Sequence, residues 1–143
     1  AAAPGEKGRN ALPLGPIVVM RAKDNAFRFA FSSSGGATAA TAMANVMFET
    51  VLAKRSLQAG ISQPRLHYET ASDEVLIEDD EKKDRLVSLI TLGHKVRSLP
   101  SIGRVNAISC PKGLPSPNPQ CDVQADPRGS GITSTVKFQK QEQ

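Results

Sequence analysis

Aromatic residues are scarce in this chain of 143 residues, which has no tryptophan, one tyrosine and five phenylalanines. Proteins that bind single-stranded nucleic acids stack the bases on aromatic side chains. The chain has 18 lysines and arginines and 14 acidic residues. The basic residues are dispersed along the sequence, since no block of five or six like charges occurs. Both features argue against a nucleic-acid partner and favour a solvated, mildly positive surface.

Long apolar runs are missing as well. No stretch reaches the roughly 18 consecutive apolar residues of a transmembrane helix, and residues 1–8 lack the hydrophobic core of a signal peptide. We therefore expect any signal peptide or membrane anchor to lie on sequence outside this chain. With 39% apolar and 22% charged residues, the composition is that of one globular domain or one subunit of a larger fold.

Cysteine occurs only twice, at Cys110 and Cys121, on either side of a proline-rich segment. A disulfide that closes this loop is our prediction, and zinc is the alternative, although two thiols without a nearby histidine pair do not supply four ligands. The acidic residues 73–81 lack the glycine and the alternation of a calcium loop, so we expect no metal site. A disulfide implies an oxidising compartment and hence an extracellular or outward-facing protein.

Apolar periodicity predicts strands at residues 16–20 and 26–31 and a helix at 37–53 with Met43, Val46, Met47 and Val51 on its apolar stripe. We also expect a short helix at 56–59 and an amphipathic helix at 79–92, with Leu86, Leu89 and Ile90 buried and Gly93 as its C-cap. Further strands are expected at 105–110, 122–125 and 133–138. The order indicates an α+β layered domain rather than a βαβ parallel sheet.

The alternating run 29–34 stops at Gly35-Gly36, directly before the alanine-rich helix. Unpaired amides at a helix start, together with the positive end of the dipole, suit an oxyanion formed during acyl transfer. The same residues also make an ordinary strand-to-helix loop, so both interpretations stay open. We interpret Ser32, Ser33 and Ser34 as capping and loop donors, since no His or Asp partner lies at a recognisable spacing.

Several motifs follow in order along the chain: Pro64-Arg65-Leu66-His67, an acidic strand at 73–78, Gly93-His94, Val105-Asn106-Ala107-Ile108 and Asp126-Pro127-Arg128. This order resembles the C-terminal part of the small subunit of gamma-glutamyltranspeptidases, also called glutathione hydrolases, over about residues 16–131. We expect an extended loop at 1–15, this small-subunit portion at 16–138 and a polar tail at 139–143.

The resemblance implies part of an αββα sandwich of the N-terminal-nucleophile hydrolase type. It also implies that Gly35 and Gly36 form the oxyanion hole, that no cofactor is needed, and that the partner is a larger subunit of the same precursor or a related chain. The implied ligand is a glutathione-like gamma-glutamyl compound. Arg65 and His67 suggest a carboxylate clamp and a titrating group, but we favour a structural pair, and we expect Asp126 and Arg128 to form a clasp.

Two departures from the family concern catalysis. The family nucleophile is an N-terminal threonine, whereas this chain begins with Ala1, so we identify no catalytic residue in it. Typical members hold the gamma-glutamyl carboxylate with a serine pair, and Leu12 and Pro13 stand closest to that pair here. Neither side chain donates a hydrogen bond, which predicts impaired activity. The alternative is a non-catalytic secreted binding or structural protein on the same fold.

Overall fold

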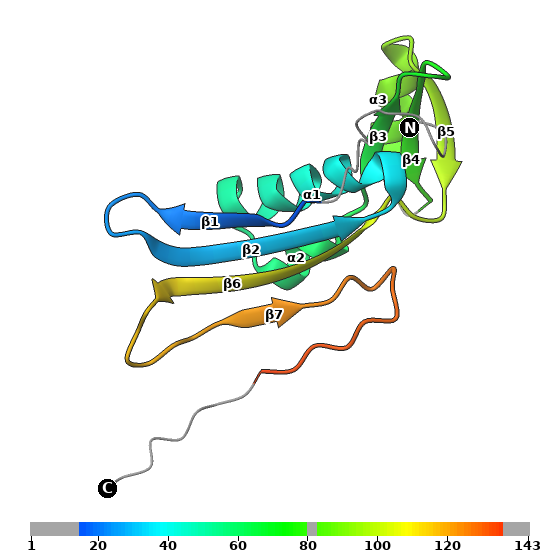
Figure 1. Cartoon of the computed structure of the whole chain (residues 1–143). Helices are drawn as coiled ribbons and strands as arrows, with labels where there is room; N and C mark the ends of the chain where they lie inside the picture. The colour runs from blue at the N-terminus through cyan, green and yellow to red at the C-terminus, as the bar shows by residue number, and fades with distance from the viewer. Residues whose placement is uncertain (1–14, 80–82, 136–143) are drawn as a thin grey trace, which may run out of the picture.

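The computed structural model describes residues 15–79 and 83–135 and contains two sheets of unequal size (Figure 1). The larger sheet has the order β1-β2-β6-β7, and its neighbouring strands are all antiparallel. The smaller sheet has the order β3-β4-β5. The strands are β1 Ile17–Arg21, β2 Ala26–Ser34, β3 Leu66–Glu69, β4 Glu74–Glu78, β5 Lys95–Leu99, β6 Arg104–Leu114 and β7 Asp122–Gln124.

Helices cover one face of the larger sheet, and the smaller sheet stands at its end (Figure 1). The helical segments are η1 Gly36–Thr38, α1 Ala39–Met47, the π-helical turn η2 Phe48–Leu52, α2 Leu57–Ser62 and α3 Lys83–Thr91. Helices α1 and α2 pack on the larger sheet, whereas α3 packs against β5. Within the part of the chain that the structure describes, no helix has the length and apolar content needed to span a membrane.

The core lies between α1, α2 and the larger sheet. Met43 and Val46 are buried there against Phe31, and Met47 and Val51 pack on the edge of the same cluster. The apolar stripe predicted from helical spacing is therefore confirmed.

Caps follow the sequence signals at two helix ends. The Ser56 hydroxyl accepts from the Ala59 amide at 3.2 Å at the start of α2. Gly93, two residues after the end of α3 at Thr91, has φ +88°, and its amide donates to the Ile90 carbonyl at 2.9 Å. Both ends match known capping patterns, which confirms Gly93 as the C-cap.

Three expectations need correction. Helix α3 has no buried residue, and Ile90, expected on its buried side, is 56% exposed; among the described elements this helix packs mainly against the edge strand β5. Strands β4 and β5 pair in parallel, so one βαβ unit exists where we expected none. Residues 133–135 form no strand, and 136–138 lie outside the described residues, as do the segments 1–14 and 139–143.

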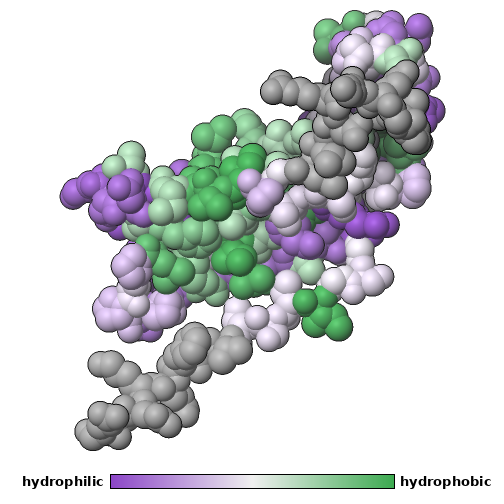
Figure 2. Space-filling model, in the orientation of Figure 1, coloured by the Kyte–Doolittle hydropathy of each residue, from purple (hydrophilic) through white to green (hydrophobic). Residues whose placement is uncertain are grey.

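The face of the larger sheet that points away from α1 and α2 is apolar. Strand register places Val18, Ala30, Ile108 and Val123 in one row across all four strands. Val18 is 57% and Ile108 36% exposed, and hydrophobic residues gather over the middle of this face in Figure 2. We call this row the outer face of the sheet.

Candidate oxyanion-binding turn

The turn from β2 into the helical layer is made by Gly35 and Gly36. Both have positive φ values, +134° and +59°, which side chains with a Cβ rarely adopt. The Thr38 amide and hydroxyl both donate to the Gly35 carbonyl, at 3.2 and 3.0 Å, and close the turn. The chain therefore reverses sharply and begins η1 with its first amides at the end of a sheet strand.

The two glycines differ in their surroundings. A Cβ on Gly35 would lie 2.7 Å from the Gly103 Cα and 2.9 Å from the Thr38 hydroxyl, whereas a Cβ on Gly36 would meet nothing within 4 Å. Gly103 is itself confined, since its Cβ would lie 2.6 Å from that of Ala42. Gly35 thus packs against a second glycine turn, and Gly36 faces open space where a ligand can approach the backbone.

Within the described residues, no side-chain cap is seen at the start of this helical layer. Gly35 and Thr38, the cap residues of η1 and α1, make no side-chain cap hydrogen bond. The interpretation of Ser32, Ser33 and Ser34 as capping residues was wrong, because β2 continues through Ser34. The first amides of a helix have no partner within it and lie at the positive end of its dipole, so an anion at Gly36 meets uncapped N–H donors.

A buried ion pair lies behind the turn. The Arg65 and Asp126 side chains are each 1% exposed, with Nη2 and Oδ2 2.7 Å apart. Asp126 Oδ2 also accepts from the Val105 amide at 2.6 Å, and Oδ1 accepts from the Arg128 amide at 3.0 Å. The expectation that Arg65 is structural fits this geometry, and the clasp of Asp126 with Arg128 is present, at 3.2 Å between Oδ1 and Nη1.

Glu78 completes this set of four residues, which we call the buried network. Its carboxylate, on a residue 2% exposed, accepts from the Arg65 and Ile102 amides at 3.0 and 2.6 Å and from Nε and Nη2 of Arg128. Sequence reasoning gave Glu78 no role because it begins an acidic run. The available signal was its position after Val75-Leu76-Ile77, where an acidic residue ends a fully buried strand.

The buried network holds the second glycine turn in place. Arg65 Nη1 donates to the carbonyls of Ile102 and Gly103, both at 3.2 Å, and Glu78 fixes the amide of Ile102. Because Gly103 packs against Gly35, the network determines where the Gly35-Gly36 turn can lie. Gly103 is the second residue that sequence reasoning missed, and a glycine directly before β6 was its only signal.

Electrostatics within the network follow from burial and pairing. Burial lowers the pKa of Arg65 despite the attraction of Asp126. Burial alone would raise the pKa of Asp126, but the amides of Arg128 and Val105 and the Arg65 guanidinium outweigh it and keep that pKa below its usual value. For Arg128, burial opposes the charged form, and the Glu78 carboxylate outweighs it, so its pKa is raised. The lowered pKa of Asp126 and the raised pKa of Arg128 both favour the charged forms at neutral pH.

The remaining predicted site residues are distributed elsewhere. His67 lies on β3 with Nδ1 2.9 Å from the Thr41 hydroxyl, in a half-buried structural contact. Cys110 and Cys121 form a disulfide with their Cα atoms 4.2 Å apart. Leu12 and Pro13 lie outside the described residues. Across residues 15–79 and 83–135, no cluster of His, Cys, Asp and Glu could hold a metal ion.

Comparisons with known proteins agree with this architecture. A mutant of gamma-glutamyltranspeptidase from Helicobacter pylori has a TM-score of 0.76 at 25% identity, covering 86% of this chain and 64% of that one. The Pseudomonas nitroreducens enzyme complexed with L-DON has a TM-score of 0.79 at 20% identity, covering 96% and 68%. The transpeptidase CapD of Bacillus anthracis has a TM-score of 0.72 at 20% identity, covering 93% and 75%.

Among curated proteins, none matches the chain significantly. The chain spans 64% of the length of the Helicobacter pylori chain, and its helix and sheet layers correspond to part of the N-terminal-nucleophile hydrolase sandwich. The family model for gamma-glutamyltranspeptidase matches residues 3–136. With nearly the whole chain matched, the protein belongs to the gamma-glutamyltranspeptidase family.

Proposed function

We propose that this chain is the C-terminal part of the small subunit of a gamma-glutamyltranspeptidase-like assembly and supplies its oxyanion-binding turn, with turnover well below that of typical members. The observation that carries the proposal is the turn itself, where the exposed backbone of Gly36 opens an uncapped helix start. The family activity that the resemblance implies is hydrolysis of glutathione, or transfer of its gamma-glutamyl group, through a threonine-linked acyl intermediate.

The chemistry assigns a defined task to this turn. Attack of a hydroxyl on the gamma-glutamyl carbonyl places negative charge on the carbonyl oxygen, and amides that are already oriented stabilise that charge without rearrangement. One such donor contributes on the order of a hundredfold in rate. No residue of this chain is assigned as the nucleophile. The proposed role of the turn is therefore to stabilise the oxyanion, and the reaction requires a nucleophile positioned beside the turn.

Impaired turnover follows from Leu12 and Pro13. The family's serine pair binds the substrate carboxylate, and side chains without a hydrogen-bond donor cannot do so. A site that loses these donors no longer fixes the substrate against the nucleophile, and such positioning accounts for a large part of enzymatic rate. This observation equally favours the second candidate function, a non-catalytic secreted binding or structural protein on the same fold.

We further propose a heterodimer in which the outer face of the sheet packs against a larger subunit of the same precursor or a related chain. An apolar row across four strands is a surface that soluble monomers seldom leave uncovered. The chain expressed alone should therefore aggregate, and it should become soluble when co-expressed with that subunit. A cooperative monomeric thermal transition of the isolated chain would contradict this proposal.

The disulfide supports an extracellular or outward-facing location for the assembly. The proposed ligand is a glutathione-like gamma-glutamyl compound, and the proposed chemistry uses no cofactor.

The experiment is an assay of the purified native assembly with a chromogenic gamma-glutamyl anilide. Turnover near background, while the anilide still binds the assembly, supports an impaired enzyme. Turnover at an ordinary enzymatic rate that a gamma-glutamyl affinity label abolishes would refute the impairment. Absence of both binding and turnover would favour the non-catalytic alternative.

A further inference from the structure

The segment between β6 and the buried network has few attachments to the rest of the fold. We call residues 115–125 the strap: they leave the larger sheet at the end of β6, make a loop at the end of the sheet away from the smaller sheet, and return as β7 (Figure 1). Apart from the ladder of β7 with β6, the strap's hydrogen bonds to described residues are internal. The Asn118 amide donates to the Ser116 hydroxyl at 3.3 Å, and Gln124 Nε2 donates to Asp122 Oδ1 at 2.7 Å.

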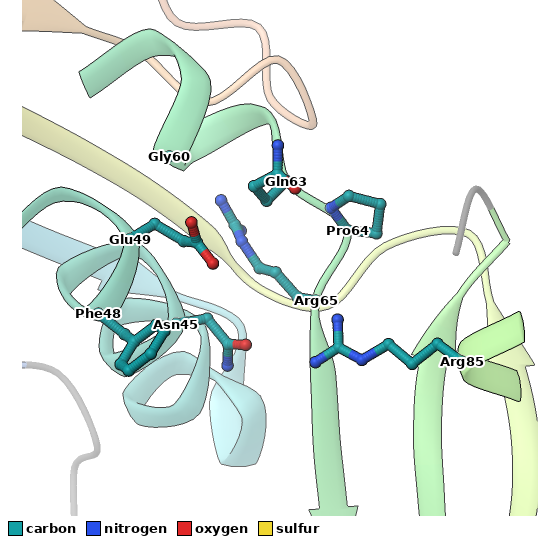
Figure 3. Close-up of a pocket in the computed structure, with 8 residues that line it drawn as sticks. All are labelled: Asn45, Phe48, Glu49, Gly60, Gln63, Pro64, Arg65 and Arg85. Carbon is teal, nitrogen blue, oxygen red and sulfur yellow. The ribbon is translucent and has the colours of Figure 1, made fainter. Parts of the chain in front are cut away.

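Both ends of the strap are firmly attached. Leu114, directly before it, pairs with Phe27 of β2. Asp126, directly after it, pairs with Arg65 at 2.7 Å in the buried network. Figure 3 shows the Arg65 side chain running from the start of β3 toward Gly60 of α2, well inside the fold. Any opening motion is therefore confined to the strap itself.

Three residue pairs and one covalent bond hold the strap between these ends. Strand β7 pairs with Ala107–Ser109 of β6 at the edge of the sheet and packs on α2. Its one apolar residue, Val123, is only partly buried. Cys121 lies directly before β7 and is bonded to Cys110 of β6. A segment with so few buried apolar contacts opens at low cost, so we expect the disulfide to keep β7 in register.

The two bonded cysteines differ in accessibility. Cys110 is 1% exposed, whereas Cys121 is partly exposed and follows residues 117–120, which are all exposed. Disulfide exchange requires that a thiolate reaches one of the two sulfurs, and exposed disulfides are the labile and regulatory ones. A small thiol from solvent therefore meets Cys121 first.

From this arrangement we infer that the disulfide is a thiol-sensitive clamp that sets whether the strap is closed or open. A thiolate from a small thiol attacks the Cys121 sulfur and forms a mixed disulfide, while the bond to Cys110 breaks and Cys110 leaves as a thiolate that takes up a proton. A second thiolate attacks the external sulfur of the mixed disulfide and releases Cys121 as a thiol. The protein disulfide gains two electrons, and two molecules of the thiol are oxidised to their own disulfide.

Opening of the strap changes the outer face of the sheet. Val123 is the β7 member of the apolar row that crosses all four strands, and β7 covers the edge of β6. Reduction therefore removes one strand from the surface that we propose to pack against the larger subunit, which weakens the association. This consequence rests on the proposed heterodimer, whereas the opening of the strap does not.

The test treats the purified assembly with dithiothreitol at pH 8 in the absence of denaturant. We expect two reactive thiols per chain while the main thermal transition persists. Hydrogen exchange measured by mass spectrometry should become at least about tenfold faster in peptides from residues 115–125 and stay unchanged in peptides from β2. A disulfide that reacts only after the assembly unfolds in urea, or strap exchange that reduction leaves unchanged, would overturn the inference.

The matched control is the double variant Cys110→Ser, Cys121→Ser. Its strap should exchange fast without any thiol and should not respond to dithiothreitol. A thiol response of the strap in this variant would refute a mechanism that acts through the disulfide. If the variant does not fold, the comparison of the parent with and without dithiothreitol decides.

The effect on assembly is measured by sedimentation of the two chains in both redox states. We expect the dissociation constant for the larger subunit to rise by at least about tenfold on reduction. Equal dissociation constants would overturn the regulatory role even if the strap opens. Chains that associate in neither state would refute the proposed heterodimer and this role with it, while the exchange experiment still decides whether the clamp exists.

Discussion

Asp126→Asn is the sharpest perturbation of the buried network. The substitution keeps the side chain's size and removes its charge, which leaves the Arg65 guanidinium buried without its counter-ion. Asp126 accepts four hydrogen bonds, from the Arg65 and Arg128 guanidinium groups and from the amides of Val105 and Arg128. An asparagine has one oxygen and one NH₂ group, so its NH₂ must face at least one of these donors.

The magnitude follows from burial. Breaking a buried pair by removing one partner costs about 3–5 kcal/mol, because the other charge stays buried without compensation. For a domain of this size, each kcal/mol lowers the thermal midpoint by roughly 2–4 °C, so we expect a loss on the order of 10 °C. Differential scanning calorimetry of the assembly measures it directly.

The matched control is Asp24→Asn. Asp24 pairs with Arg21 at 2.6 Å in similar chemistry, but the two side chains are 45% and 40% exposed. Solvent screens such a pair, so this variant should unfold close to the parent midpoint. Equal losses in the two variants, or a parent-like midpoint for Asp126→Asn, would refute the argument that the buried network stabilises the fold.

The remaining predictions concern the turn, acid and the disulfide. Gly35→Ala should prevent normal folding because its Cβ meets the facing backbone at 2.7 Å, whereas Gly36→Ala should cost only the roughly 1–2 kcal/mol of a left-handed residue; equal midpoints by calorimetry would contradict this. The pKa of Asp126 is lowered in the folded protein, so its contribution to the free energy of unfolding is complete above pH about 4 and is lost as the pH falls through that lowered pKa. Urea titrations should therefore show that the free energy of unfolding falls more steeply with acid in the parent than in Asp126→Asn. Thiol titration of the unfolded, unreduced protein should find no free thiol, and the double variant Cys110→Ser, Cys121→Ser should lose about 2–4 kcal/mol in the same urea titrations; two reactive thiols would exclude the bond.

Local signals in the sequence were enough for the elements around the core. The stripe from Met43 to Val51 and the stop at Gly93 depend on neighbours within a few residues, and the structure has them. The helix α3 was different. Its apolar residues repeat at helical spacing, yet Ile90 is exposed, because periodicity shows that a helix has an apolar face and does not show what covers it.

The candidate site shows the same difference between features that are local in the sequence and features that depend on distant residues. The Gly35-Gly36 turn was visible because strand, turn and helix are contiguous in sequence. The buried network joins Arg65 to residues 13 and 61 positions away, Glu78 and Asp126, and the role of Glu78 depends on a pairing that only the fold creates. Gly103 was missed for the same reason, since its importance comes from the facing turn.

We propose that the Gly35-Gly36 turn can bind an oxyanion and that turnover is limited by the missing carboxylate-binding serine pair. The most direct measurement is kcat/KM of the purified assembly for a gamma-glutamyl anilide, before and after the double substitution Leu12→Ser, Pro13→Ser. Restored hydrogen bonds to a charged carboxylate should raise kcat/KM by at least about tenfold from a value near background. A parent assembly that already turns over at an ordinary rate, or a double variant that stays at background, would contradict the account.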